Sequence, residues 1–258
     1  MKQEVFQAFS LNFLKSVDST NRWLQDRINK QKTIANQVVC AEYQSGGRGM
    51  DGNQWHSERG QNLLFSLGMD ASFILASEQF LITQMIALAI VDELSDHIDH
   101  RKISIKWPND IFFEEKKLGG ILISNTIRAS RLDQSVIGVG LNINQMNFPE
   151  WIPRPVSMGL ICNQKFDSLD ILKGILKRFS LRMDQAKNSD GLLRIAQDYH
   201  QKLFRLDQWY VYKLDNSQIE LKIKGIGEYG MLKLENRAGK NIDCDFKAIR
   251  FLFDDELL

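Results

Sequence analysis

The amino-acid sequence predicts an α/β (α+β) protein, in which a large domain with a mixed sheet and packed helices is followed by a small β-barrel domain. Three observations support this prediction. In the first part of the chain, β-rich segments alternate with a helical pattern over residues 77–98. From Asp207 onward the sequence changes to short alternating runs that are separated by turn signals. The composition, with 43% apolar and 25% charged residues, is typical of a globular protein.

Length and charge limit the domain organisation and the function. The chain has 258 residues, which fits one large and one small domain because a domain usually has about 100 to 200 residues. We expect the boundary near residue 205, with domains at residues 1–205 and 206–258. The net charge is only +1, so the sequence lacks the basic footprint of broad nucleic-acid binding. A DNA-binding function is therefore disfavoured.

The cysteines and the apolar segments indicate a cytoplasmic protein. Cys40, Cys162 and Cys244 are widely spaced and odd in number, as expected for reduced thiols. The N-terminus lacks the apolar region and cleavage site of a secretory signal. The longest apolar region, residues 80–91, is too short and too polar to span a bilayer. We therefore expect a cytoplasmic location without membrane association.

The first elements alternate between helix and strand. Residues 18–21 are small and polar and precede apolar residues at helical spacing, which predicts a short helix capped by one of them. Residues 38–43 and 62–69 are β-rich and are expected to form two strands. Between these strands, residues 45–53 contain four glycines and predict a mobile loop.

The rest of the large domain follows the same pattern. Residues 77–98 are expected to form an amphipathic helix that packs on the sheet. Residues 145–156 contain three of the four prolines and predict a second loop. Further strands are expected at residues 103–107, 111–113, 118–124 and 135–144, further helices at 168–187 and 190–204, and strands of the small domain at 209–214, 218–227, 230–236 and 241–252.

The glycine-rich loop is the first candidate binding site. Successive glycines allow backbone N–H groups to approach an anion, and Arg48 adds a charge-assisted donor for carboxylate or phosphate. The loop matches neither the dinucleotide fingerprint nor the P-loop, so a simple hairpin connection is the alternative. Trp55, just after the loop, is either a core anchor or a surface on which a base stacks.

Two further segments carry candidate ligand contacts. A hairpin over residues 111–124 would bring Lys106 and Lys117 together only with an anion between them, such as a triphosphate, because two ammonium groups repel. The alternative is a pair of solvated lysines. In residues 138–144, two glycines indicate close approach of a backbone or ligand, and Asn142 either caps a turn or contacts ribose and phosphate oxygens.

The order and spacing of four segments together closely resemble the signature segments of biotin–protein ligases. They are DSTN at 18–21, EYQSGGRGMDGNQW at 42–55, KWPNDIFFEEKKLGGIL at 106–122 and IGVGLNIN at 137–144. The resemblance implies a catalytic domain related to class II synthetase-like ligases and an SH3-like C-terminal barrel. It also implies that ATP and biotin form biotinyl-5′-AMP, and that a lysine of a biotin carboxyl carrier protein domain then attacks this mixed anhydride.

The same resemblance implies residue roles. Lys117 would be the principal catalytic residue, assisted by Arg48, because joining two anions requires fixed positive charge at the reacting phosphorus. ATP would bring Mg²⁺, and no metal ligand is assigned directly. The other implied biotin-binding residues are Ser19, Thr20, Asn21, Gln44, Gly47, Gly49, Met50 and Gly120. The other implied residues for ATP and the adenylate are Trp55, Lys106, Asn109, Asp110 and Asn142.

Two departures from the family pattern have consequences. Many bacterial relatives have more arginines in the glycine-rich loop, where this chain has Met50, Asp51 and Asn53, so retention of the adenylate is expected to be weaker. Only 17 residues precede the DSTN segment, which predicts the single-function class without a DNA-binding domain and without specific DNA binding. The resemblance also allows a homodimer.

Two rival functions remain. A lipoyl ligase or octanoyl transferase would share the catalytic fold, but would need a long apolar tunnel in place of polar contacts to the ureido ring. A catalytically silent binding protein would use the same loops only to hold a small acid. The joint presence of Arg48, Lys106 and Lys117 disfavours the silent protein.

Overall fold

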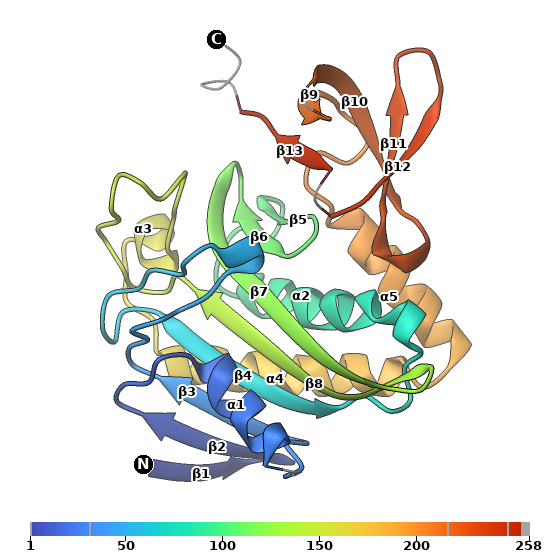
Figure 1. Cartoon of the computed structure of the whole chain (residues 1–258). Coiled ribbons are helices and arrows are strands. Elements are labelled where there is room, and N and C mark those ends of the chain that lie inside the picture. The colour runs from blue at the N-terminus through green and yellow to red at the C-terminus, as the bar shows by residue number, and fades with distance from the viewer. Residues whose placement is uncertain (1, 31, 216, 247, 254–258) are drawn as a thin grey trace.

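An eight-stranded mixed sheet forms the centre of the larger part of the molecule (Figure 1). The structure is a computed structural model that describes residues 2–30, 32–215, 217–246 and 248–253. The strand order is β1-β2-β3-β4-β8-β7-β6-β5, and β2 and β3 are the parallel neighbours. The strands are β1 (Lys2–Phe6), β2 (Phe9–Leu14), β3 (Gln37–Ala41), β4 (Leu63–Asp70), β5 (Ile103–Lys106), β6 (Asp110–Phe113), β7 (Lys116–Arg128) and β8 (Arg131–Leu141). The predicted mixed sheet is confirmed.

Helices cover both faces of this sheet. Successive side chains of a strand point to opposite faces, so each face has its own apolar cluster. Val38 belongs to the large cluster and Val39 to a small one that includes Leu24 of α1. On the large-cluster side, α2 packs on the sheet and contacts α4 and α5. The helices are α1 (Thr20–Asn29), α2 (Phe80–Leu94), α3 (Met158–Cys162), α4 (Ser168–Gln185) and α5 (Ser189–Gln201).

Most predicted elements are present in the structure, although several bounds differ and the run expected at residues 241–252 is divided into Asn241–Cys244 and Ile249–Phe251. The helix expected over residues 77–98 ends at Leu94, after a 3₁₀ turn at Ala76–Glu78. The hairpin β1–β2 and the short helix α3 were not predicted. β1 lies at the edge of the sheet and its side chains are mostly exposed, so it lacks the apolar alternation that marks a half-buried strand.

The C-terminal strands form a second, antiparallel sheet with the order β12-β11-β10-β9-β13. It consists of β9 (Trp209–Leu214), β10 (Ser217–Ile226), β11 (Leu232–Asn236), β12 (Asn241–Cys244) and β13 (Ile249–Phe251). The predicted small β domain is therefore present. Among the described residues the end strands β12 and β13 are not paired with each other, so the sheet is open rather than a closed barrel.

The two sheets pack against each other through buried aromatic side chains. The indole Nε1 of Trp107, which follows β5, donates to the Gly230 carbonyl at 2.9 Å. The Trp107 ring also stacks on Phe246, with ring centroids 5.2 Å apart and planes 8° apart. The guanidinium of Arg205 donates to the Leu252 carbonyl at 2.7 Å. These contacts fix the C-terminal sheet beside the end of β5.

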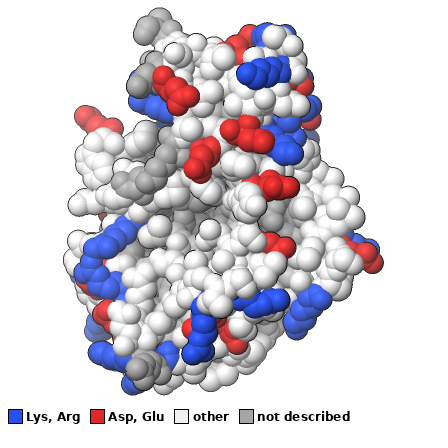
Figure 2. Space-filling model, turned by 45° about the vertical axis from the view of Figure 1, so that its right-hand side comes forward, with Lys and Arg blue, Asp and Glu red and all other residues white. Residues whose placement is uncertain are grey.

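The surface and the thiols agree with the sequence analysis. On the face in Figure 2, basic and acidic side chains lie among each other without one large patch of a single sign. All three cysteines are unpaired, and burial raises the pKa of the Cys40 thiol to about 12. Within the residues that the structure describes, none of the helices has the length and apolar character needed to cross a membrane.

Candidate active site

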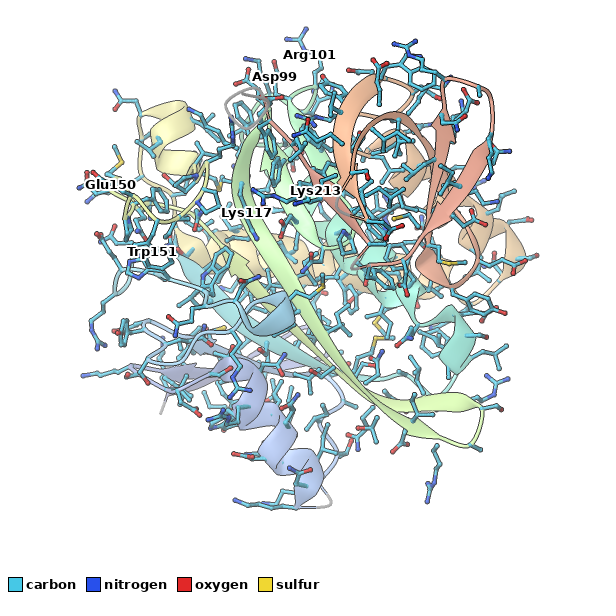
Figure 3. All side chains as sticks on the ribbon, turned by 45° about the horizontal axis from the view of Figure 1, so that its top comes forward. Asp99, Arg101, Lys117, Glu150, Trp151 and Lys213 are labelled. Atoms are coloured by element: carbon cyan, nitrogen blue, oxygen red, sulfur yellow. The ribbon has the colours of Figure 1, made fainter. Side chains whose placement is uncertain are left out.

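A cleft of about 820 Å³ lies on the α1 side of the large sheet, and four parts of the chain line it. The floor is formed by β7 and β8, and one wall by the N-terminus of α1 with the glycine-rich loop. The opposite wall is formed by the β5–β6 turn with Phe246, Ile249, Arg250, Phe251 and Phe253, and Glu150, Ile152, Pro153 and Arg154 lie at the edge. Figure 3 shows Lys117 on β7 between the loop that carries Trp151 and the sheet that carries Lys213.

One end of the cleft is neutral and rich in hydrogen bonds. Ser19 is the N-cap of α1, and its hydroxyl accepts a hydrogen bond from the Arg22 N–H. The first helical residue, Thr20, lines the cleft. The Thr20 backbone N–H donates to Gln44 Oε1 at 2.7 Å, and the Thr20 hydroxyl contacts the same oxygen at 3.0 Å. Asn21 donates to the Leu122 carbonyl at 3.3 Å. The four polar residues that the family resemblance assigned to biotin are therefore neighbours here.

Ser66 also belongs to this end, although the sequence analysis did not identify it. It lies on β4, its hydroxyl is 2.8 Å from the Thr20 hydroxyl, and it lines the cleft. A signal was present in the sequence, because Ser66 is the polar residue within an apolar strand run from Leu63 to Met69.

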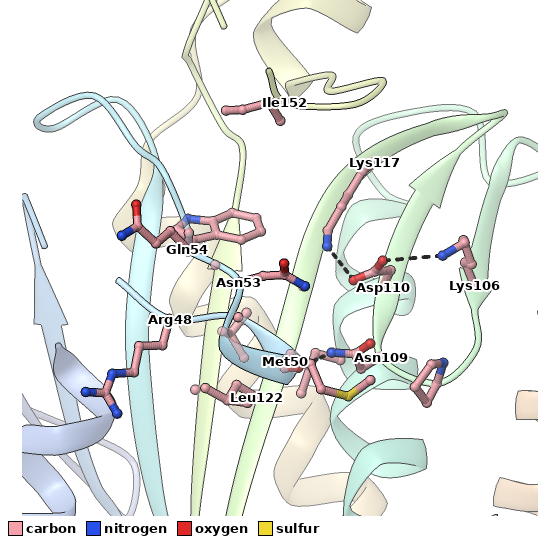
Figure 4. Close-up of a pocket in the computed structure, with 18 of the residues that line it drawn as sticks. Arg48, Met50, Asn53, Gln54, Lys106, Asn109, Asp110, Lys117, Leu122 and Ile152 are labelled. Carbon is pink, nitrogen blue, oxygen red and sulfur yellow. Dashed lines mark hydrogen bonds and ion pairs between the residues drawn. The ribbon is translucent and has the colours of Figure 1, made fainter. Parts of the chain in front are cut away.

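The other end of the cleft holds two lysines around one carboxylate. Lys117 Nζ lies 2.6 Å from Asp110 Oδ1, and Lys106 Nζ lies 3.8 Å from Asp110 Oδ2 (Figure 4). Antiparallel pairing positions all three residues, since Lys106 is the partner of Asp110 in β5–β6 and Lys117 is the partner of Phe112 in β6–β7. The anion expected between the lysines is thus a side chain of this protein, whereas the sequence analysis suggested a triphosphate.

The environment of Lys106 disfavours its charge. Burial lowers the pKa of Lys106, Asp110 counteracts this effect, and Lys117 and Arg205 add to the lowering through charge repulsion. The ammonium also lies 4.8 Å from the centroid of the Phe251 ring. An arriving anion would therefore stabilise the charged form of Lys106.

Trp55 lies across the glycines of the floor, between the two ends. A Cβ added to Gly140 would lie 2.4 Å from Trp55 Cε2, and one added to Gly120 would lie 3.3 Å from Cζ3. The close approach predicted for the glycines of β8 is thus made by this indole ring at Gly140, and by the Asn21 side chain at Gly138. Its Nε1 is buried and has no hydrogen-bond partner among the described residues. Lys117 Nζ lies 5.8 Å from the ring centroid.

The glycine-rich loop folds back on itself next to Trp55. The Trp55 N–H donates to the Gly47 carbonyl at 3.0 Å, and the Gly49 N–H donates to the Asn53 carbonyl at 2.7 Å. A Cβ on Gly47 would lie 2.6 Å from the Trp55 carbonyl oxygen, so glycine is required there. Met50 lies on the side of Asn109 in Figure 4, whereas the guanidinium of Arg48 points away from the lysine pair.

Two asparagines from the predicted site brace loops. Asn142 is buried, and its Nδ2 donates to the Val156 carbonyl at 3.1 Å. It is not among the residues that line the cleft, so of the two roles left open for Asn142 its contacts fit the bracing of a turn. Asn109 lines the cleft, and its Nδ2 donates to the Ile121 carbonyl at 2.7 Å.

Several lining residues come from segments without a recognisable motif. Arg154 lies in the proline-containing loop after β8, and Arg250, Phe251 and Phe253 come from the C-terminal sheet and the residues after it. The Arg154 guanidinium lies 4.5 Å from the centroid of the Phe253 ring. No local pattern connects these residues with the cleft. Pairing of the loop backbone with Lys117 brings Arg154 there, and the packing of the two sheets brings Arg250, Phe251 and Phe253.

The described residues contain no group of three or more His, Cys, Asp or Glu side chains that could hold a metal ion. Asp110 supplies a carboxylate at the lysine end of the cleft. Mg²⁺ usually binds through one or two carboxylates together with phosphates of the substrate. The donor set therefore fits a Mg²⁺ ion that arrives with a nucleotide.

Three comparisons relate the chain to known proteins. The sequence pattern of the Biotin/lipoate A/B protein ligase family matches residues 13–142. The bifunctional ligase/repressor BirA of Escherichia coli is 32% identical over 158 residues, which cover 60% of this chain and 46% of that protein. The chain thus spans about half the length of this relative.

Two other relatives match over more of their length. The biotin–acetyl-CoA-carboxylase ligase of Mycobacterium tuberculosis is 26% identical over 231 residues, which cover 87% of this chain and 83% of that protein. The structure of biotin protein ligase from Aquifex aeolicus in complex with biotin and ATP is similar, with a TM-score of 0.71 and 26% identity. That similarity covers 94% of this chain and 99% of the other chain.

Proposed function

The chain belongs to the Biotin/lipoate A/B protein ligase family, and from this membership we propose that it is a biotin–protein ligase. It activates biotin with ATP as biotinyl-5′-AMP and transfers the biotinyl group to a lysine of a biotin carboxyl carrier protein domain. One observation carries the proposal: a single cleft joins a neutral hydrogen-bonding end at Thr20 and Gln44 to a cationic end at Lys106 and Lys117. Biotin has the same polarity, with a neutral ureido ring at one end and a carboxylate at the other.

The ureido ring binds at the α1 end of the cleft. Ser19, Thr20, Asn21 and Gln44 supply side-chain donors and acceptors there, and all four line the cleft. Gly120 and Gly138 line the floor of the cleft, on which the ring and the apolar tail lie. A lipoyl or octanoyl group has no ureido ring to accept a hydrogen bond from the Gln44 side-chain amide, and a buried donor without a partner costs about 1 to 3 kcal/mol.

Lys117 is the principal catalytic residue of the first step. A carboxylate oxygen of biotin attacks the α-phosphorus of ATP, and pyrophosphate leaves with the electrons of the broken P–O bond. Lys117 is paired with Asp110 in this structure, so the incoming anions exchange for that carboxylate. Lys106 lies close enough to share the charge of the phosphates, and fixed cations at the reacting centre lower the barrier.

The nucleotide occupies the space between Trp55 and the β5–β6 turn. Trp55 offers an aromatic face for stacking against adenine, and Asn109 and Asp110 lie at the phosphate end. Asp110, once released from Lys117, is the carboxylate that would hold a Mg²⁺ ion arriving with the nucleotide. Bound Mg²⁺ would neutralise charge on the leaving pyrophosphate.

Closure of the glycine-rich loop completes the site. Arg48 points away from the lysine pair in this structure, so a change in the loop is needed before Arg48 contacts the carboxylate or the phosphate. Gly47, Gly49 and Met50 accompany this movement. The loop then shields the mixed anhydride from water until the acceptor lysine arrives.

In the second step the neutral amine of the carrier lysine attacks the biotinyl carbonyl carbon. An amide bond forms, the bond to AMP breaks, and the amine loses a proton. We place this reaction in the cytoplasm, where ATP is available and where the three unpaired cysteines would stay reduced.

Exchange of labelled pyrophosphate into ATP tests the proposal directly. Biotin-dependent exchange, followed by biotinylation of a purified carrier domain, is the expected result. Octanoate-dependent exchange would identify a lipoyl-type ligase instead. If neither acid supports exchange, the chain is a binding protein without adenylation activity.

A further inference from the structure

A chain of three polar side chains runs from the centre of the large sheet to the α1 end of the cleft. Ser66 Oγ lies 2.8 Å from Thr20 Oγ1, which lies 3.0 Å from Gln44 Oε1. Ser66 is fully buried on β4, and Thr20 is 3% exposed. The contacts therefore lie in a dry environment, where the direction of each hydrogen bond has a large effect on binding.

The donor in each of these bonds follows from the chemistry of the groups. The Thr20 backbone N–H lies 2.7 Å from the Gln44 amide, and because an N–H only donates, the atom it meets must be the carbonyl oxygen Oε1. That oxygen only accepts, so the Thr20 hydroxyl uses its one hydrogen on Gln44. The remaining bond must then run from the Ser66 hydroxyl to Thr20 Oγ1.

This direction determines what the cleft offers to a ligand. Both donors of Thr20 hold Gln44 Oε1, so the other half of the amide, Nε2 with its two N–H groups, is turned away from α1. It lies 3.4 Å from the position that a Cβ on Gly47 would take, on the loop side of the cleft. A group that presents an oxygen acceptor is therefore recognised by Gln44.

We propose that Ser66 is a positioning residue for ureido recognition: by donating to Thr20 it fixes the hydroxyl that orients the Gln44 amide. The inference rests on the proposed function, because it deepens the recognition of biotin by that same cleft. Gly138, the β8 partner of Ser66, leaves room for the neighbouring Asn21 amide, since a Cβ there would lie 2.9 Å from Asn21 Nδ2 and in van der Waals contact with Ser66 Oγ at 3.4 Å.

Ser135 provides a matched control. It is also a fully buried serine in the same sheet, on β8, but its hydroxyl has no hydrogen-bond partner among the described residues and it does not line the cleft. Replacing either serine by alanine removes one buried hydroxyl from a central strand. A difference in ligand binding between the two variants therefore reports the contact with Thr20 rather than the loss of a buried polar group.

Calorimetric titration of the full chain with biotin, desthiobiotin and ATP tests the proposal. Ser66→Ala should weaken biotin about threefold to tenfold, the effect of one net hydrogen bond. Desthiobiotin, which keeps the ureido group, should lose affinity by the same factor. ATP affinity should change by less than about twofold, and Ser135→Ala should leave all three affinities near those of the wild type.

A double-mutant cycle separates an action through Thr20 from a direct one. Thr20→Val has nearly the same shape and removes the acceptor of the Ser66 hydrogen bond. In that background Ser66→Ala should change biotin affinity by less than about 1.5-fold, because the partner is already absent. An additive loss would overturn the positioning role, since Ser66 would then act on the ligand independently of Thr20.

The remaining outcomes are also decisive. If the wild type binds biotin and Ser66→Ala binds it equally well, the role of Ser66 is wrong while the proposed function stands. Equal losses in Ser66→Ala and Ser135→Ala would overturn the role as well, because they would reflect a general effect on the sheet. If the wild type binds no biotin, the proposed function fails and the inference fails with it.

Discussion

Asp110 neutralises two lysines that would otherwise repel each other at one end of the cleft. Its carboxylate is 2.6 Å from Lys117 and 3.8 Å from Lys106, so each lysine is held in place before a substrate binds. An anionic substrate then exchanges for a carboxylate that is already there. The Asp110 carboxylate thus reduces the electrostatic repulsion between the two lysine ammonium groups.

Replacement of Lys117 by alanine should reduce biotin-dependent pyrophosphate exchange on the order of 10²-fold or more, because one fixed charge at the reacting centre is lost. The fold should remain intact, as circular dichroism would show. Lys116→Ala is the control, since Lys116 is the exposed neighbour on the same strand. Near wild-type exchange by the Lys117 variant would mean that another residue has the principal role.

Because of Lys106, the affinity for ATP should fall as the pH rises in the alkaline range. Burial lowers the pKa of Lys106, and bound phosphate favours its charged form. ATP affinity should therefore be fully present below the pKa of the free protein and fall as pH rises through it, by up to about tenfold per unit. Lys106→Arg should flatten this dependence because arginine stays protonated.

ATP titrations from neutral pH up to the ordinary lysine pKa of about 10.4, at constant ionic strength, measure this effect. Lys116→Arg, an exchange at an exposed position, should keep the slope of the wild type. Identical slopes for Lys106→Arg and the wild type would show that another group controls the pH dependence.

Among the elements, the glycine-rich loop carries two side chains that lie differently with respect to the cleft, Met50 and Arg48. Met50 lines the cleft within a 3₁₀ turn at Met50–Gly52, whereas Arg48 points away from the lysine pair. Four glycines make the loop costly to order, since fixing a backbone takes about 1 to 2 kcal/mol per residue. Contacts to the bound adenylate must supply this free energy when the loop closes.

Met50→Arg should slow the release of biotinyl-5′-AMP by about one to two powers of ten, because a hydrogen bond to a charged group contributes about 1.5 to 3 kcal/mol. Arg48→Ala should speed the release. The measurement is the dissociation rate of preformed adenylate after dilution into buffer without carrier protein. Met50→Leu, which keeps the bulk without the charge, should behave as the wild type.

An unchanged rate for Met50→Arg, together with faster release from Arg48→Ala, would contradict this interpretation of the loop. Position 50 would then face away from the adenylate in the closed state.

In the molecule as a whole, the cleft depends on both sheets. Phe251 and Phe253 form part of its wall, and Lys106 lies over the ring of Phe251. Trp107 connects this wall to the large sheet through its hydrogen bond to Gly230 and its stacking on Phe246. Trp107, which directly follows Lys106 in the chain, therefore holds the C-terminal sheet next to the lysine end of the cleft.

Trp107→Phe should lower the free energy of unfolding by about 1 to 3 kcal/mol, because the buried Gly230 carbonyl loses its donor. Urea unfolding followed by circular dichroism measures this loss. Trp151→Phe is the control, since Trp151 is 63% exposed and its exchange should change stability by less than about 0.5 kcal/mol. Equal stabilities of the two variants would show that the Trp107 hydrogen bond does not hold the sheets together.

Elements with local signals could be predicted from the amino-acid sequence alone. The small polar residues at 18–21 and the apolar spacing after them predict α1, and the short alternating runs after Asp207 predict the second sheet. The motif segments likewise identify the lysines and most of the polar residues of the cleft. Capping, turn chemistry and side-chain periodicity act within a few residues, so they can be recognised in one stretch of sequence.

Which of these residues meet depends instead on the tertiary structure. Strand register places Asp110 between Lys106 and Lys117, and the packing of α1 on the sheet places Ser66 beside Thr20, 46 positions away along the chain. Packing of the second sheet brings Phe246, Phe251 and Phe253 to the cleft, while Asn142 stays buried outside it. These contacts depend on register and on packing between distant segments, and both are properties of the folded chain as a whole.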